Sequence, residues 1–183
     1  MTLRRALLTV AALVLGFAGQ ALAIEPAVEG TVTVRFAASS TLHGFAGTAG
    51  PAGFRLEPSP GGSWRAVVEV PVAALTTDNS WRDKNMRVTL KADAHPSIHA
   101  TFTAVVPDTV RTSGSLPFRL SIGGVERELT AEVSSWQQAA EKVEFDAVFL
   151  VSLSAFGLEA PGALFMRVDD SVKVTAHVTL VRK

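Results

Sequence analysis

The sequence predicts an all-β protein of one domain, folded as a sandwich or a closed barrel of about eight short strands. Three observations lead to this fold class. Apolar and polar residues alternate with period two along most of the chain after residue 30, which is typical of half-buried strands. Gly123 and Gly124 separate two such segments, as in a β-hairpin with a two-residue turn. No helical pattern recurs between the alternating segments, so a parallel α/β sheet is not expected.

The first 23 residues are interpreted as a secretory signal peptide and are set aside from the fold. Arg4 and Arg5 form a basic start, an apolar run follows over 6–18, and small residues precede a cleavage site expected after Ala23. The alternative is a membrane anchor, but this run is shorter than the about 20 residues that a spanning helix needs. The predicted domain is then 24–183, in an exported protein.

The composition excludes several function classes. The sequence has 17 Lys and Arg against 17 Asp and Glu, and loss of Arg4 and Arg5 leaves the mature chain slightly acidic. A nucleic-acid partner would need a basic face, so none is expected. The sequence contains no cysteine, which rules out disulfides, zinc–thiolate sites, haem attachment through Cys-x-x-Cys-His and cysteine nucleophiles.

The alternation locates the strands in order. In TVTVRF, for example, Val32, Val34 and Phe36 share one face while Thr33 and Arg35 take the other. The segments predicted as strands in this way are 31–38, 41–48, 53–57, 64–72, 97–106, 115–122, 125–133, 143–153 and 171–182.

One segment between these strands breaks the alternation. Ser80 lies three residues before Asp83, as at the start of a capped helix, and Asp83 and Arg87 are spaced to pair along a helix. Pro96 biases the residue before it toward extended geometry. We therefore predict one short helix at about 80–91, lying over the β-structure.

Metal and catalytic chemistry find little support in the spacing of residues. His95 and His99 are four residues apart, which in a strand separates them by roughly 13 Å, too far for one ion. The sequence has neither a Gly-x-Ser-x-Gly elbow nor a His-Glu-x-x-His helix. His43, within SSTLHGFAGTAG, is interpreted as a structural hydrogen-bonding residue near a barrel end, with contact to a ligand headgroup as the alternative. No cofactor or metal is predicted.

Apolar bulk is unusually abundant for a half-exposed sheet. The segments 66–72 and 147–151 are apolar on nearly both faces, and the mature chain has nine phenylalanines among its predicted strands and turns. One explanation is a filled core with the helix packed on the barrel exterior. The other is a hollow barrel that holds one apolar ligand. Composition does not separate the two.

Five blocks from residue 75 onward carry a resemblance to a known family. They are LTTDNSWRDKNM, AHPSIHATF, GSLPFRLSIGGVERELTAEV, LSAFGL and VDDSVKVTAHV. Their order and spacing resemble the YceI-like family of lipid-binding, lipocalin-like periplasmic proteins. In the first block Thr77, Asn79, Arg82 and Asp83 match the family pattern. The chain departs from that pattern at Asp78, where the family usually has glycine, and in its N-terminal part.

The resemblance implies an antiparallel up-and-down, lipocalin-like barrel of about eight strands with one short helix. It also implies a periplasmic, non-enzymatic protein that binds a polyisoprenoid lipid, such as a quinone or polyprenyl lipid, in its lumen. Alternation combined with this resemblance gives the predicted lumen residues Phe36, Val68, Val70, Phe102, Phe118, Leu120, Phe145 and Phe149. The residues predicted for the mouth are His43, Asn79, Arg82 and Asp83, with anchoring of the helix as the alternative role of Arg82 and Asp83.

Three hypotheses of function follow. The first is transport or storage of an amphiphilic lipid, such as an isoprenoid quinone, with transient contact to a membrane. The second is a structural or stress-response barrel without a ligand. The third is a small exported enzyme that uses His43 with Asp83 or a serine.

Overall fold

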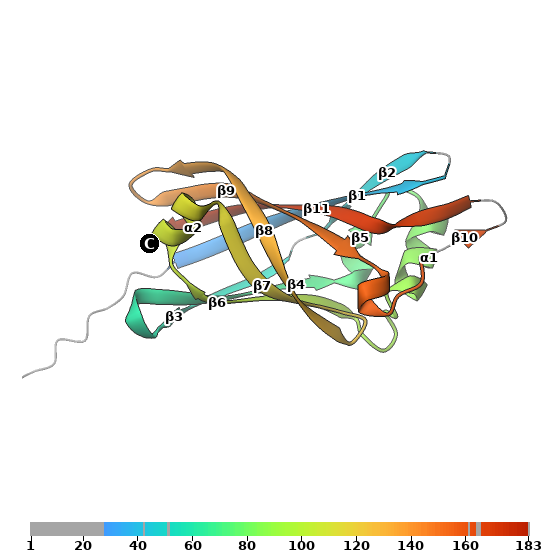
Figure 1. The fold of residues 1–183 in the computed structure, drawn as a ribbon, viewed down its shortest axis with the longest axis horizontal. Helices are drawn as coiled ribbons and strands as arrows, with labels where there is room; N and C mark the ends of the chain where they lie inside the picture. Colours follow the sequence, from blue (N-terminus) through green and yellow to red (C-terminus); the bar gives the residue numbers. More distant parts are fainter. Residues whose placement is uncertain (1–27, 42, 51, 161, 164–165, 183) are drawn as a thin grey trace, which may run out of the picture.

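The computed structural model describes residues 28–41, 43–50, 52–160, 162–163 and 166–182 (Figure 1). The predicted signal peptide lies outside the described residues and stays a prediction. Strands dominate the described chain, as the sequence predicts. None of the helices in this part has both the length and the apolar character needed to cross a membrane.

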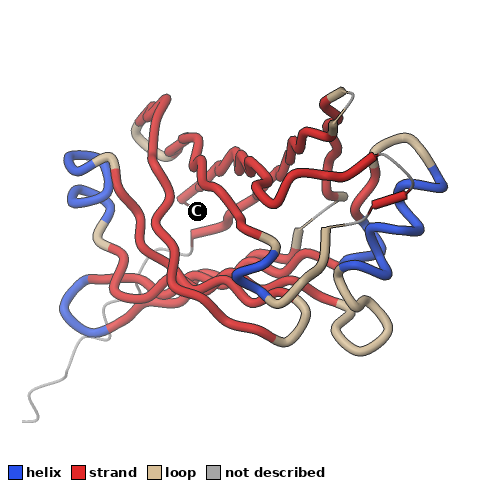
Figure 2. The backbone as a smooth tube through the Cα atoms, turned by 45° about the vertical axis from the view of Figure 1, so that its right-hand side comes forward, coloured by secondary structure: helices blue, strands red, loops and turns tan. Residues whose placement is uncertain are grey.

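The described strands form one antiparallel sheet that curls into an elongated barrel (Figures 1 and 2). They are β1 (Val28–Ser40), β2 (Gly44–Ala49), β3 (Gly53–Ser59), β4 (Ser63–Pro71), β5 (Leu75–Thr76), β6 (Ser97–Val105), β7 (Ser115–Ile122), β8 (Val125–Gln138), β9 (Lys142–Ser152), β10 (Gly162–Ala163) and β11 (Met166–Arg182). Their order across the sheet is β3-β4-β6-β7-β8-β9-β11-β1-β2-β5, and β10 pairs with β11. Most neighbours are consecutive in the chain, which confirms the up-and-down antiparallel fold.

The curled sheet is closed in different ways along its length. β1 pairs with β11 along nearly all of β1, so the first and last described strands are neighbours. At one end, β5 pairs with β2 at Thr48 and Ala49. Elsewhere β3 lies beside β1, and no backbone ladder joins these two strands in the described chain. There the Phe54 ring of β3 packs over Gly30 of β1, so side chains close the seam.

Bulges bend the long strands around the interior. The pairing register shifts between Ala38 and Ser40 on β1, and between Ser134 and Gln137 on β8. Within the second shift Ser135 has a φ of 55°, a left-handed conformation that interrupts the ladder. Such irregularities increase the local twist and bend a strand, which favours curling over a flat sheet.

Two α-helices are described, and one of them was not predicted. α1 (Ser80–Thr89) lies where the sequence places a helix, although it ends two residues earlier and its N-cap is Asn79 rather than Ser80. α2 (Pro107–Ser113) connects β6 to β7. It begins at Pro107 and ends at Gly114, which has a φ of 63°. Proline at the start of a helix and glycine at its end are both common. Its seven residues are too short to show helical periodicity against the flanking alternation.

The predicted Gly-Gly hairpin is present between β7 and β8. Gly123 and Gly124 have φ values of 57° and 83°, a conformation that few residues other than glycine adopt. The imidazole of His95 lies directly over Gly124, where a β-carbon would collide with it. The turn therefore needs glycine for both its backbone conformation and its close contact.

We predict that Gly47→Ala destabilises the fold. Gly47 of β2 lies opposite Phe36 of β1, and a β-carbon on Gly47 would overlap the Phe36 ring and the Thr76 carbonyl oxygen. Because Thr76 O belongs to the backbone, the collision forces strand movement, and we expect a loss of about 1–3 kcal/mol in unfolding free energy. Urea denaturation measures it.

The matched control is Gly53→Ala on β3, where the nearest atoms, Cβ and O of Glu69, are both 3.7 Å from the added β-carbon. We expect this variant to stay within about 0.5 kcal/mol of the original protein. Equal effects of the two substitutions would contradict the argument from close packing.

Candidate ligand-binding cavity

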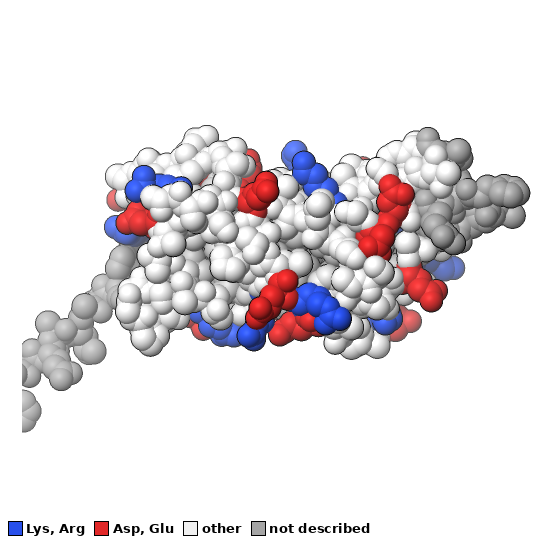
Figure 3. Space-filling model, in the orientation of Figure 1, with Lys and Arg blue, Asp and Glu red and all other residues white. Residues whose placement is uncertain are grey.

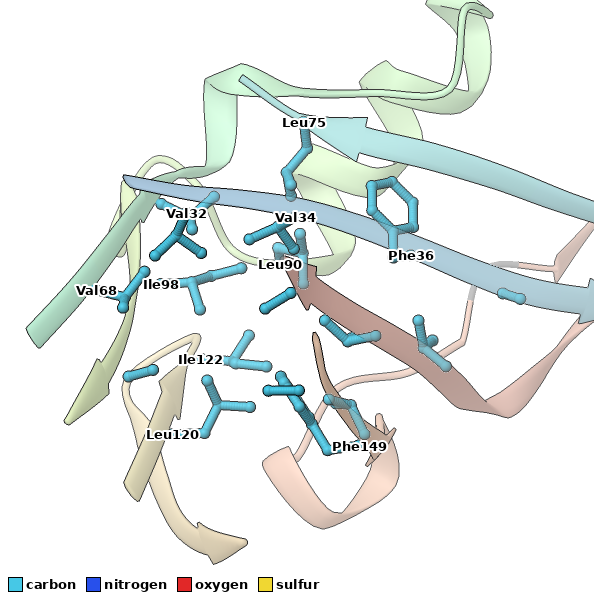
Figure 4. Close-up of a pocket in the computed structure, with 18 of the residues that line it drawn as sticks. Val32, Val34, Phe36, Val68, Leu75, Leu90, Ile98, Leu120, Ile122 and Phe149 are labelled. Atoms are coloured by element: carbon cyan, nitrogen blue, oxygen red, sulfur yellow. The ribbon is translucent and has the colours of Figure 1, made fainter. Parts of the chain in front are cut away.

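A cavity of about 690 Å³ occupies the interior of the barrel. Its wall is made by inward-facing side chains of β1, β3, β4, β6, β7, β8, β9 and β11, and by α1. Figure 4 shows side chains from several strands, among them Val32, Val68, Leu120 and Phe149, pointing toward this common space. The volume lies within the range of sites that hold a small molecule or a cofactor. The barrel interior is therefore not filled by its own side chains.

The structure places all eight residues predicted for the lumen on the cavity wall. Three of them form an aromatic cluster: the Phe118 ring stacks on Phe102 with centroids 5.1 Å apart, and meets Phe149 edge-on at 4.9 Å. The remaining five are Phe36, Val68, Val70, Leu120 and Phe145. Their position is settled by the fold, whereas contact with a ligand stays a prediction.

Sequence reasoning missed a second set of wall residues, and twelve of them lie on β1, β3 and β11. Val32 and Val34 share a face with Phe36, so the choice of Phe36 could have brought them in. The predicted strand 171–182 also alternates, and its apolar face could have been assigned to the lumen in the same way. The wall residues missed on these three strands are Val32, Val34, Ala38, Ser40, Phe54, Leu56, Val168, Val172, Val174, Ala176, Val178 and Leu180.

Polar side chains gather at one end of the cavity, which we call the mouth. They come from the β1–β2 turn and from the α1 region, and they are Ser40, His43, Asn79, Arg82, Asn85 and Thr89. Four described wall residues are classed as exposed, namely His43, Asn79, Trp81 and Val88, and all four lie at this end. The cavity is thus apolar along its length and meets solvent at a polar mouth.

Arg82 and Phe45 link the two sides of the mouth. The Arg82 guanidinium lies 4.7 Å from the centre of the Phe45 ring, which is on β2. A cation over an aromatic face contributes about 0.5–1 kcal/mol at an exposed site. Both side chains line the cavity, so this contact joins α1 to the strand edge where a ligand would enter.

The backbone of His43 takes part in the β1–β2 turn, while the residue is exposed to solvent. Its carbonyl oxygen accepts hydrogen bonds from the Ser40 amide at 3.0 Å and from the Ser40 hydroxyl at 2.6 Å, which closes the β1–β2 turn. The residue also lines the mouth. Both interpretations made from the sequence, a hydrogen-bonding turn residue and a headgroup contact, are compatible with this position.

Asp83 does not line the cavity, which corrects its prediction as a mouth residue. Its carboxylate is buried and accepts hydrogen bonds from the Thr77 amide at 2.8 Å, the Thr77 hydroxyl at 2.6 Å and the Thr76 hydroxyl at 2.9 Å. The bond from the Thr77 hydroxyl is the main cause that lowers the pKa of Asp83. Asp83 therefore anchors α1 to the segment that leads into it, the alternative role that the sequence had left open. A general base that pairs His43 with this carboxylate is not supported.

Two neighbours complete this anchor. The Asn79 side chain accepts a hydrogen bond from the Arg82 amide at 3.0 Å and so caps α1. Asp78, which stands where the resembled family usually has glycine, has a φ of 56°. Aspartate tolerates this left-handed conformation better than most residues, and its amide donates to the Thr76 hydroxyl at 3.1 Å. The conformation explains why glycine suits the position.

A histidine and an aspartate also form a hydrogen bond on the outer face of the sheet. His177 Nδ1 of β11 lies 2.8 Å from Asp146 Oδ1 of β9, and this hydrogen bond is the main cause that lowers the pKa of Asp146. The pair is a cross-strand contact outside the cavity. Within the described ranges, no three His, Cys, Asp or Glu side chains gather closely enough to hold a metal ion.

Comparison with known proteins identifies the family of the domain. A family model described as YceI-like domain matches residues 15–180. A search of curated proteins found no match.

Solved structures of similar fold come from several bacteria. BcnA of Burkholderia cenocepacia is 16% identical over 81% of this chain and 95% of its own, with a TM-score of 0.66. A polyisoprenoid binding domain from Saccharophagus degradans, implicated in plant cell wall breakdown, is 14% identical over 87% of this chain and 100% of its own, with a TM-score of 0.64. A Campylobacter jejuni YceI protein is 18% identical over 75% and 84%, with a TM-score of 0.54. At these identities the likeness shows a shared fold.

We predict that Asp83→Asn destabilises the protein at neutral pH and much less in acid. The lowered pKa means that the native state favours the carboxylate, so its contribution is fully present above the ordinary aspartate pKa near 4 and is lost as the pH falls through the native value. We expect about 1–3 kcal/mol of lost unfolding free energy at pH 7, because an amide cannot accept all three hydrogen bonds. Urea titrations at neutral pH and well below pH 4 measure the difference.

The matched control is Asp169→Asn on β11, which removes an exposed carboxylate. We expect it to stay within about 0.5 kcal/mol of the original protein at pH 7. A difference between Asp83→Asn and the original protein that grows in acid would contradict the anchoring role.

Proposed function

The chain belongs to the family of YceI-like domains, and from this membership we propose that it binds an amphiphilic isoprenoid lipid inside its barrel, without catalysing a reaction on it. The observation that carries the proposal is the cavity of about 690 Å³, apolar along the barrel and polar at the mouth. The polyisoprenoid binding domain of similar fold supports the choice of ligand class. We further propose that the protein acts in the periplasm, after removal of the predicted signal peptide.

The cavity suits the two parts of such a lipid. Burial of apolar surface contributes about 25 cal/mol per Å², so an isoprenoid chain against phenylalanine and valine side chains gains affinity without any charge pairing. A quinone or phosphate headgroup would lie at the mouth, where Arg82, Asn85 and His43 offer hydrogen-bond donors. The arrangement favours one orientation, with the chain inside and the headgroup toward α1.

An unfilled interior favours this proposal over a barrel that serves only as a structural module. A void of this size gives up dispersion contacts that a packed core would make. The proposed lipid would restore those contacts and stabilise the native state by mass action. Because such a lipid is insoluble in water, the protein would store it or carry it between membranes.

The direct test is native mass spectrometry of residues 24–183, purified without detergent, before and after incubation with a long-chain ubiquinone or a polyprenol. We expect a mass increase that matches one lipid molecule. Protein that remains ligand-free after incubation with both lipids would contradict the proposal.

We predict that Ala176→Phe blocks the cavity. Ala176 of β11 lines the wall, and the register places it beside Ala147 of β9 and Val34 of β1. A phenyl group in place of this small side chain would project into the lumen and occupy the space of the isoprenoid chain, and we expect ubiquinone affinity to fall roughly 10-fold or more. The measurement is a ubiquinone titration followed by native mass spectrometry.

Thr175→Phe is the matched control, because the next residue of the same strand points to the opposite face and does not line the cavity. We expect it to keep the original affinity. An equal loss in both variants would indicate general damage to β11 and would count against the lumen as the binding site.

A further inference from the structure

The rim of the mouth exposes large apolar side chains to solvent. Trp81 is 63% exposed and Val88 is 73% exposed, and both are large apolar residues of α1. The two residues are seven positions apart, which is about two helical turns, so they lie along the same side of α1. Both also line the cavity. The apolar edge of α1 is therefore continuous with the lumen.

A row of cations lies next to this apolar edge. Lys84 and Arg87 of α1, and Lys91 just past its end, are exposed and are spaced to share one side of the helix. They line a shallow depression that also includes Val88 and one carboxylate, Asp93. Lys84 and Arg87 make no ion pair within the described ranges. By contrast, acidic and basic residues are interspersed over the flank of the barrel shown in Figure 3.

We propose that α1 docks the mouth onto the surface of an anionic phospholipid bilayer, an inference that rests on the proposed lipid-binding function. Trp81 and Val88 would enter the interfacial layer, while Lys84, Arg87 and Lys91 would contact lipid phosphates. Interfacial helices bind by this combination of apolar insertion and basic charge. Tryptophan in particular favours the level of the headgroups.

The geometry favours a bilayer over an acidic protein as the partner. The apolar edge lies between the cavity and the cations, so docking by the cations presses the mouth against the membrane. An insoluble cargo could then pass between bilayer and lumen without crossing water. An acidic protein partner would use the cations and would not explain why the exposed apolar side chains border the lumen.

Vesicle co-sedimentation of the protein without its predicted signal peptide, residues 24–183, tests the electrostatic part. We expect strong partitioning onto vesicles of phosphatidylcholine mixed with phosphatidylglycerol, weak partitioning onto phosphatidylcholine alone, and loss of the difference at high salt. Lys84→Gln together with Lys91→Gln should weaken partitioning onto the anionic vesicles roughly 30-fold, from about 1 kcal/mol for each cation near the surface. The charge-matched control, Arg55→Gln with Arg65→Gln on β3 and β4, should leave it unchanged.

Tryptophan fluorescence tests the apolar part. We expect a blue shift when the protein meets anionic vesicles and its loss in Trp81→Ser, since Trp81 is far more exposed than the other two tryptophans. Leu150→Ser removes an apolar side chain that is also 63% exposed but lies on β9, outside the cavity wall. It should partition like the original protein.

The outcomes separate docking from lipid binding. Ubiquinone binding without any preference for anionic vesicles would overturn docking and leave the proposed function standing; the surface would then belong to a protein partner. Preference for anionic vesicles that Lys84→Gln with Lys91→Gln does not reduce would also overturn it. Because neither lysine lines the cavity, ubiquinone affinity should be unchanged in that variant. Vesicle binding without ubiquinone binding would support docking and contradict the proposed cargo.

Discussion

Pairing between β1 and β11 is the contact on which the rest of the structure depends. It joins strands from the two ends of the described chain and so brings β1 beside β3, where side chains close the barrel. The register of this pair also fixes which residues face inward, because a slip of one position would turn every side chain to the other face. In this register Ala176 lies between Val34 and Ala147, which puts small side chains into the wall where three strands meet.

A hollow barrel places unusual demands on the remaining contacts. The interior cannot supply the dense packing that stabilises an ordinary core. Backbone ladders and packed regions outside the cavity must compensate. Val72 and Phe156, each only 1% exposed, are the largest fully buried side chains of the described chain, and neither lines the cavity. The proposed ligand would be a structural element as well as a cargo, since it would complete the packing that the chain leaves open.

The residues that match the family pattern most clearly serve the position of α1. Thr77 holds the buried Asp83 carboxylate, and Asn79 caps the helix. Asp78, which departs from the pattern, takes the left-handed conformation that leads into the helix. Only Asn79 and Arg82 of this group also reach the mouth. The motif thus holds α1 beside the cavity, and the exposed side of the helix is available to contact a ligand or a membrane.

The sequence by itself determined the class of fold, the Gly-Gly hairpin, the helix after residue 79 and the inward residues of several strands. Each depends on local periodicity or on the conformational preference of one residue, which a linear pattern contains. Only the tertiary structure decided that the barrel is hollow, that Asp83 is buried against Thr77 outside the cavity wall, and that Trp81 stands exposed at the rim of the mouth. Alternation assigns residues to two faces, but the space between opposite walls depends on strand register and curvature. Those are set by contacts between residues far apart in the chain, such as Phe54 over Gly30 and Arg82 over Phe45.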